Sequence, residues 1–190
     1  MKGLPNQLTI LRILIIPVFV LAYYIPWEFR PWLTAGLFLV AAITDALDGY
    51  LARKWQQTSA FGAFLDPVAD KLVVATALVL LVANPLVQEK VWALPLLTIT
   101  VAVIIGREIV VSALREWMAE AGSRATVAVS WIGKFKTAAQ MTAITLLLFT
   151  DQSGGWLFQI GEALLYVAGF LTLWSMLKYL KAAWPALMKK

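Results

Sequence analysis

The amino-acid sequence predicts an all-α, polytopic membrane protein with six transmembrane helices and both termini on the cytosolic side. Hydrophobic residues make up 61% of its 190 residues and charged residues only 14%, with a mean hydropathy of +0.79. Soluble domains are about half apolar and about a quarter charged. The apolar residues fall into six segments, and lysines and arginines gather in alternate connections between them. At this length we expect a single domain that covers residues 1–190.

The six apolar segments lie, in order along the chain, near residues 8–26, 32–53, 62–83, 91–117, 132–150 and 156–184. A helix that crosses the hydrocarbon core needs about 20 mostly apolar residues. The second segment is uncharged from Pro31 to Thr44 and reaches that length only with its charged carboxyl end. The third is uncharged from Leu72 to Gln88 and needs its charged amino end. The charges of these two segments therefore belong to the helices, at one membrane face.

The distribution of lysine and arginine predicts the orientation, because positively charged connections stay in the cytosol. One set of alternate connections holds most of these residues: Lys2, Arg53, Lys54, Arg115, Arg124, Lys134, Lys136, Lys178, Lys181, Lys189 and Lys190. The other set holds only Arg30 and Lys90. Both termini should therefore be cytosolic, while Arg30, Lys90 and Asp151 should face outward.

The chain contains no cysteine and no histidine. A disulfide framework and a thiolate metal site are thereby excluded. The commonest general base and transition-metal ligand is missing as well. Any bound metal has to be held by oxygen atoms, which favours magnesium or manganese.

Four aspartates lie among glycines where the second segment ends and the third begins. They follow the pattern Asp45-x2-Asp48-Gly49-x2-Ala52-Arg53, then Gly62-x3-Asp66-x3-Asp70. Helical residues three or four apart share a face, so each segment carries its aspartates as one stripe. A short connection makes the two segments antiparallel neighbours, and the stripes can face each other.

Ionised carboxylates at the end of a membrane span are costly unless cations neutralise them. Four carboxylates balance two divalent cations, and two metals beside a phosphate ester indicate phosphoryl-transfer chemistry. The alternative is that the aspartates form structural ion pairs with Arg53, Lys54 and Lys71. Those cations do not explain why two glycines stand within the same stripes.

The same stretch resembles the signature of the CDP-alcohol phosphatidyltransferase family, whose members move a phosphatidyl group from a CDP-linked lipid to an alcohol and release CMP. The matched positions are Asp45, Asp48, Gly49, Ala52, Arg53, Gly62, Asp66 and Asp70. The resemblance implies that Asp45, Asp48 and Asp66 bind two divalent cations, Mg²⁺ or Mn²⁺. It implies that Asp70 is both a ligand and the general base. Three further residues would border the cytidine diphosphate: Gly49, Arg53 and Gly62.

A cluster of cations in the fourth and fifth segments indicates a phosphorylated acceptor. Arg107 follows a long uncharged run, so it should lie inside the membrane boundary and face the bundle interior. Arg115 lies two turns further along roughly the same face. Lys134 and Lys136 open the fifth segment, where a helix N-terminus itself attracts anions. The alternative is ordinary positive-inside charge.

The segment Ser112-Ala113-Leu114-Arg115-Glu116 and the segment Gly133-Lys134-Phe135-Lys136-Thr137 resemble bacterial family members that use sn-glycerol 3-phosphate. This resemblance implies that CDP-diacylglycerol and glycerol 3-phosphate are the substrates. It implies that the acceptor phosphate is held by Arg107, Arg115, Lys134 and Lys136. It also implies a homodimer in the inner (cytoplasmic) membrane, in contact with membrane lipid, with the active site facing the cytosol. We expect no nucleic-acid partner.

The N-terminal pattern Pro5-Asn6-x2-Thr9-x2-Arg12 also resembles the opening of that family. Its polar residues recur every three positions on one side of a helix, where Asn6, Thr9 and Arg12 could contact the nucleotide or the lipid diphosphate, with Asn6 and Thr9 at the CDP moiety. The alternative is a capped helix in which Arg12 reaches toward water along its own stem.

Two other functions compete with this interpretation. A related phosphatidyltransferase could use another acceptor, such as inositol phosphate or phosphatidylglycerol, and the basic cluster disfavours uncharged acceptors only. A divalent-cation transporter could also carry intramembrane carboxylates. A transporter should have polar groups near the bilayer midplane, whereas here the acidic residues gather at one end of their segments.

Overall fold

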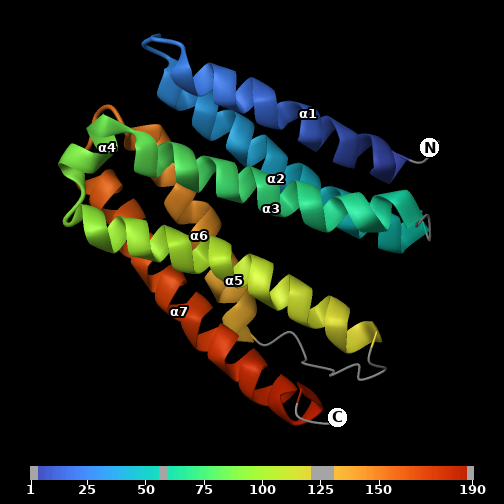
Figure 1. Ribbon diagram of the computed structural model, residues 1–190. Coiled ribbons are helices and arrows are strands. Elements are labelled where there is room, and N and C mark those ends of the chain that lie inside the picture. The colour runs from blue at the N-terminus through green and yellow to red at the C-terminus, as the bar shows by residue number, and fades with distance from the viewer. Residues whose placement is uncertain (1–3, 56–59, 121–130, 188–190) are drawn as a thin grey trace. The chain divides into compact units, whose positions relative to one another are not determined.

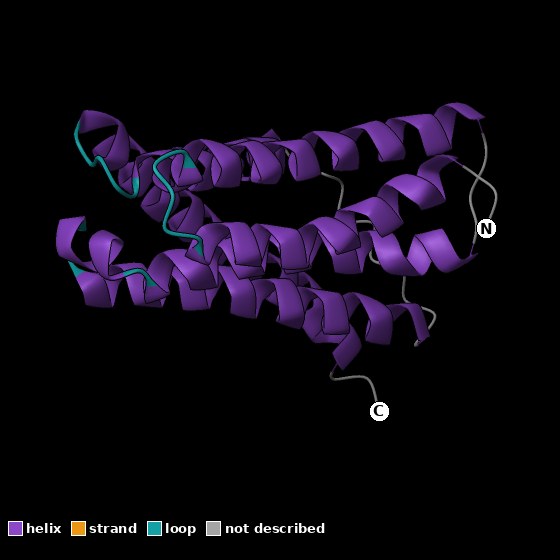
Figure 2. Ribbon diagram, turned by 90° about the horizontal axis from the view of Figure 1, so that it is seen from above, coloured by secondary structure: helices purple, strands orange, loops and turns teal. Residues whose placement is uncertain are grey.

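The computed structural model describes residues 4–55, 60–120 and 131–187. Throughout these ranges the regular elements are helices (Figures 1 and 2), which confirms the all-α prediction. The helices are α1 (Leu4–Tyr24), α2 (Arg30–Trp55), α3 (Ala60–Ala83), α4 (Pro85–Lys90), α5 (Leu94–Glu120), α6 (Trp131–Thr150) and α7 (Trp156–Leu187). Each predicted apolar segment is helical over most of its length, and the short α4 is an addition that the hydropathy pattern did not predict.

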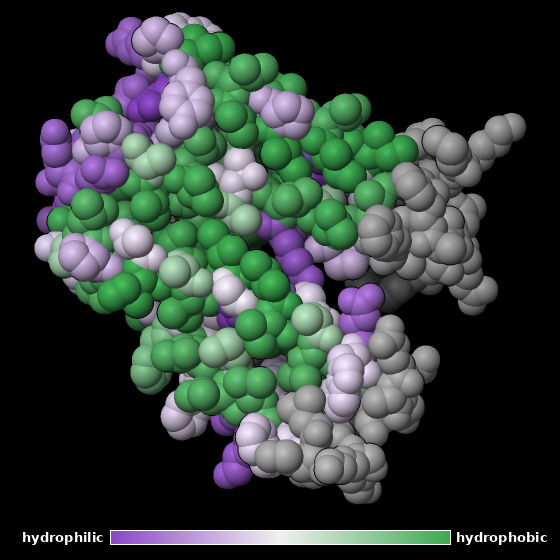
Figure 3. All heavy atoms as spheres, in the orientation of Figure 1, coloured by the Kyte–Doolittle hydropathy of each residue, from purple (hydrophilic) through white to green (hydrophobic). Residues whose placement is uncertain are grey.

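Two helices in the described ranges are long and apolar enough to cross a membrane. They cover Leu94–Met118 within α5 and Trp156–Lys181 within α7, and a shorter apolar stretch covers Thr9–Tyr24 in α1. Large apolar side chains such as Leu21 and Phe170 are exposed. Figure 3 shows hydrophobic residues over most of the visible face. These features indicate a helical membrane protein, whereas the number of six spans stays a prediction.

Prolines lie in the first turn of several helices, because proline has no N–H to leave unsatisfied there. Pro31 is the second residue of α2, Pro85 opens α4, and Pro95 is the second residue of α5. The side chain of Asn84 caps α4, since its Oδ1 accepts a hydrogen bond from the Leu86 N–H at 2.9 Å. Such caps satisfy one of the free donors at a helix start.

The first of two compact units comprises Met1–Lys90 and Ile144–Phe158. Within it α1 packs against α2 and α3, and α2 packs against α3. Its core contains the fully buried side chains of Phe38, Leu78 and Leu81. These contacts position the two helices that carry the aspartates.

The second compact unit comprises Val91–Ala143 and Gln159–Lys190, which includes α5, much of α6 and most of α7. Here α5 and α7 approach closely at Gly169, where an added Cβ would lie 2.6 Å from Thr100 Cγ2. A small residue at such a crossing lets two helix backbones come together, as is common in membrane proteins. The same helix α5 carries the cations of the predicted acceptor cluster.

Candidate active site

The aspartate motif occupies two neighbouring helices of the first unit. Asp45 and Asp48 lie within about three turns of the end of α2, and Asp66 and Asp70 within about three turns of the start of α3. Figure 1 shows these helices side by side, joined at the ends that carry the motif. The helical spacing that places each pair on one face is therefore present.

Side chains are described for Asp45 and Asp70, both of which keep partial solvent access. The other motif residues are helical, but their side chains lie outside the described part: Asp48, Gly49, Ala52, Arg53, Gly62 and Asp66. Among the described residues no three acidic side chains form a metal-binding group. The complete four-carboxylate cage therefore stays a prediction.

Asp45 has a cationic partner on a different helix. Arg12 of α1 donates from Nη1 to Asp45 Oδ1 at 2.7 Å, and the Arg12 side chain is 1% exposed. Arg12 therefore does not extend toward water. Sequence reasoning placed Arg12 on the correct face of α1 but did not pair it with Asp45. One signal could have found the pair, because a lone arginine within an apolar segment needs an anion.

The described carboxylates are suitable for a divalent cation. Asp45 retains 39% exposure of its side chain despite its bond to Arg12, so part of the carboxylate stays accessible. Carboxylate oxygens are the ligands that Mg²⁺ and Mn²⁺ prefer. Thr9 lies one turn before Arg12 on α1 and is equally buried, whereas the Asn6 side chain lies outside the described part.

The second unit brings together part of the predicted acceptor cluster. Arg107 of α5 and Lys136 of α6 both pair with the carboxylate of Glu108, the Lys136 Nζ lying 3.6 Å from Glu108 Oε1. Their side chains are only 13% and 7% exposed. This shielding distinguishes both cations from ordinary surface charge. Arg115 and Lys134 lie on the same two helices, with side chains outside the described part.

Sequence reasoning missed Glu108 as a site residue, although it lies next to Arg107. Its carboxylate is the group that links α5 to α6 at this point. The four aspartates belong to the first unit and the cations to the second, and each group is described within its own unit.

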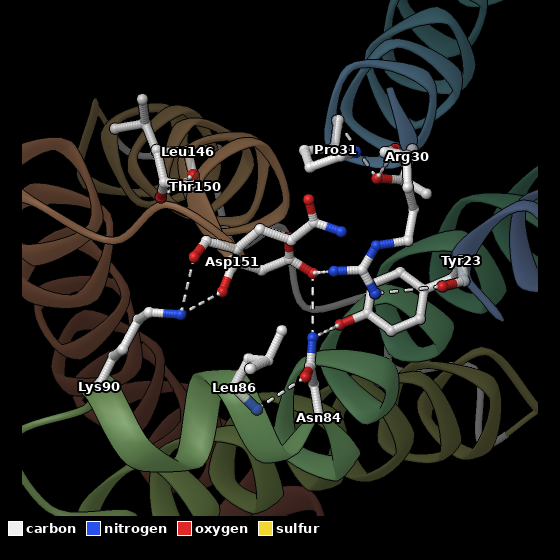
Figure 4. Close-up of polar contacts among 11 residues, drawn as sticks. Tyr23, Arg30, Pro31, Asn84, Leu86, Lys90, Leu146, Thr150 and Asp151 are labelled. Atoms are coloured by element: carbon white, nitrogen blue, oxygen red, sulfur yellow. Dashed lines mark hydrogen bonds and ion pairs between the residues drawn. The ribbon is translucent and has the colours of Figure 1, made fainter. Parts of the chain in front are cut away.

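A second polar cluster lies at the other end of the first unit, around Asp151 (Figure 4). Arg30 Nη2 donates to Asp151 Oδ2 at 2.7 Å, and Asn84 Nδ2 donates to the same oxygen at 3.0 Å. Lys90 Nζ donates to the Asp151 carbonyl oxygen at 2.7 Å. Asn84 also donates to the Tyr23 hydroxyl at 2.7 Å. The cluster thereby ties together the ends of α1, α2, α3 and α6.

Burial raises the pKa of Asp151 above its ordinary value, although the positive charges of Arg30 and Lys90 act in the opposite direction. The turn that follows requires glycine. Gly154 and Gly155 have φ angles of 68° and 82°, a region that other residues rarely adopt. The Gly154 N–H bonds to the Thr150 carbonyl oxygen at 2.7 Å and closes α6. This cluster has a structural role and supplies no predicted substrate contact.

The aspartate motif on α2 and α3 is typical of one class of helical membrane enzyme. The model of the CDP-alcohol phosphatidyltransferase family matches residues 2–174, which include every predicted site residue. The chain belongs to this family.

Curated relatives cover almost the whole chain. A protein of Shigella flexneri serotype 5b (strain 8401) is 52% identical over 181 residues, 95% of this chain and 94% of the relative. A protein of Escherichia coli (strain K12) has the same identity and coverage. A protein of Haemophilus influenzae is 50% identical over 186 residues, 98% of this chain and 96% of the relative. Each is named CDP-diacylglycerol–glycerol-3-phosphate 3-phosphatidyltransferase.

Proposed function

We propose that this protein transfers the phosphatidyl group of CDP-diacylglycerol to sn-glycerol 3-phosphate, giving phosphatidylglycerol phosphate and CMP. One observation carries the proposal: a relative named for this reaction is 52% identical over 95% of the chain. Two shielded cations in the second unit support a phosphorylated acceptor, because a phosphate group suits a pair of basic side chains better than a neutral alcohol does.

Asp45, Asp48, Asp66 and Asp70 would hold two divalent cations, Mg²⁺ or Mn²⁺. When bound, the cations would neutralise charge on the diphosphate and on the departing CMP. The ion pair between Arg12 and Asp45 supports this role, because it holds one carboxylate in a fixed orientation while leaving part of it accessible.

Asp70 would accept the proton of the attacking hydroxyl. The hydroxyl oxygen would form a bond to the phosphatidyl phosphorus while the bond from that phosphorus to the CMP oxygen breaks. The phosphate of glycerol 3-phosphate would be bound by Arg107, Arg115, Lys134 and Lys136. The residues expected to border the CDP moiety are Asn6, Thr9, Gly49, Arg53 and Gly62.

The membrane arrangement is part of the proposal. Six spans with both termini in the cytosol would place the aspartates at the cytosolic face of the inner membrane, where CDP-diacylglycerol presents its nucleotide. The acyl chains would stay in the bilayer. We propose a single catalytic domain over residues 1–190 that forms a homodimer.

The test is to incubate the purified protein with CDP-diacylglycerol and a panel of alcohols, and to identify the lipid product by mass spectrometry. The panel contains glycerol 3-phosphate, inositol phosphate, free inositol and phosphatidylglycerol. We expect phosphatidylglycerol phosphate and an equal amount of CMP with glycerol 3-phosphate alone. A product formed only with inositol phosphate, or cardiolipin formed from phosphatidylglycerol, would assign a different acceptor. No CMP release with any alcohol would refute transferase activity.

A further inference from the structure

Glu108 contacts both described cations of the predicted acceptor cluster through a single oxygen. Its Oε1 forms an ion pair with Arg107 and lies 3.6 Å from Lys136 Nζ. We propose that Glu108 is a positioning residue, which holds the Arg107 guanidinium and the Lys136 ammonium together in the geometry that binds the phosphate of the acceptor. This inference rests on the proposed function, in which those two cations hold glycerol 3-phosphate.

Electrostatics gives the reason that such a residue is needed. Two positive charges on neighbouring helices repel each other, and shielding from solvent strengthens the repulsion. A carboxylate between them offsets that repulsion. Two cations and one anion leave a net charge of +1, so the group still attracts a phosphate.

The backbone at Glu108 accepts a local hydrogen bond, and Arg107 keeps a donor for a ligand. The Ser112 hydroxyl donates to the Glu108 carbonyl oxygen at 2.6 Å, one turn along α5. Among the described residues, the buried Arg107 Nε has no hydrogen-bond acceptor. An arginine has five N–H donors, so one carboxylate oxygen does not use all the donors of Arg107.

A competing role for Glu108 predicts the opposite change in the KM for glycerol 3-phosphate. Glu108 could stand in the place of the acceptor phosphate, so that the ligand has to displace it. Removal of the carboxylate would then lower the KM for glycerol 3-phosphate. Under the positioning role the same change raises that KM, because the two cations move apart. The sign of the change in KM distinguishes the two roles.

The first experiment measures steady-state kinetics of Glu108→Gln and Glu108→Ala with each substrate varied in turn. Loss of one charge-assisted contact corresponds to at least about tenfold in affinity. We expect the KM for glycerol 3-phosphate to rise about tenfold in Glu108→Ala and less in Glu108→Gln, which keeps the shape and an acceptor oxygen. The KM for CDP-diacylglycerol should change less than about twofold. The matched control is Glu116→Gln, which changes an exposed glutamate on the same helix.

A double-mutant cycle tests whether Glu108 acts through its partners. If it positions Lys136, the effects of Glu108→Ala and Lys136→Met on the KM for glycerol 3-phosphate should not add, because both disrupt one arrangement. Purely additive effects would contradict the inference. Equal loss in both KM values, with a lower thermal midpoint, would show a merely structural role and would also overturn it.

A binding measurement separates this inference from the proposed function. Inorganic phosphate is titrated into the detergent-solubilised protein, without CDP-diacylglycerol, by calorimetry. If the wild type does not convert glycerol 3-phosphate but binds phosphate more tightly than Glu108→Ala does, the function fails and the positioning role stands. If the wild type converts glycerol 3-phosphate and Glu108→Ala has an unchanged or lower KM, the positioning role fails and the function stands.

Discussion

Gly169→Ala should weaken the packing of α5 against α7 in the second unit. The new Cβ would lie 2.6 Å from Thr100 Cγ2, with Thr100 Cβ at 3.6 Å and Oγ1 at 3.8 Å. Only the first of these distances is a clash, so the methyl group of Thr100 determines whether Gly169→Ala destabilises the protein. Overpacking typically costs about 1–3 kcal/mol, whereas alanine in place of glycine gains up to about 1 kcal/mol inside a helix. The net destabilisation should be up to about 2 kcal/mol.

The assay is thermal unfolding of the purified protein in detergent, followed by circular dichroism. Thr100→Ser removes the clashing methyl group and little else. In that background Gly169→Ala should become neutral or stabilising by up to about 1 kcal/mol, because only the helix-propensity gain remains. The matched control is Gly36→Ala in α2, where an added Cβ has no neighbour within 4 Å. It should be neutral or slightly stabilising.

The same contact should affect the acceptor site. Thr100 precedes Arg107 by seven residues, about two helical turns, so both lie on the same side of α5. A shift of α5 at Gly169 should therefore raise the KM for glycerol 3-phosphate. The reasoning is wrong if Gly169→Ala is more stable than the wild type, or if Gly169→Ala is no better tolerated in the Thr100→Ser background than in the wild type.

Three further predictions concern the aspartates and the Asp151 cluster. Asp66→Asn, or a chelator added to the wild type, should abolish turnover while the protein stays folded, and full activity under either condition would contradict the metal assignment. Asp70→Asn should lower kcat by about 10²–10⁴-fold, measured as CMP release, and a near wild-type rate would exclude Asp70 as the base. Asp151→Ala should destabilise the protein by about 3–5 kcal/mol, because it leaves the Arg30 guanidinium, 11% exposed, without its carboxylate. Burial raises the pKa of Asp151, so the folded protein binds this proton more tightly than the unfolded chain does; the stability added by that proton is complete below about pH 4 and is lost as the pH rises through the raised pKa, a step that Asp151→Asn should lack in melting curves over pH.

The helices could be predicted from sequence because long apolar runs leave few alternatives. The short α4 was missed because its six residues include Gln88, Glu89 and Lys90, which give no apolar run. Its start depends on a proline and an asparagine cap, which are local signals that hydropathy does not detect. Neither α2 nor α3 is apolar over its full length, because each combines an apolar part with a charged part. Whether such a helix crosses the membrane depends on the groups that surround its charged residues.

The candidate site could be predicted from sequence where the residues that form it belong to a single helix. The aspartate spacing of α2 and α3 is a local pattern, and so is the cation Arg107 after a long uncharged run. Contacts between helices could not be read in the same way. Arg12 and Asp45 are 33 residues apart in sequence. Glu108 and Glu116 look alike in the sequence, and only the packing of α6 distinguishes the glutamate that meets Lys136.

The most direct test of the account is the kinetic effect of Arg107→Ala with each substrate varied in turn. A charge-assisted hydrogen bond contributes about 1.5–3 kcal/mol, so kcat/KM for glycerol 3-phosphate should fall at least about tenfold. The KM for CDP-diacylglycerol should change little, and Lys181→Ala, which removes an exposed cation of the second unit, should have no effect. If Arg107→Ala instead weakens CDP-diacylglycerol alone, the cluster belongs to the donor site, and the structural support for a phosphorylated acceptor is lost.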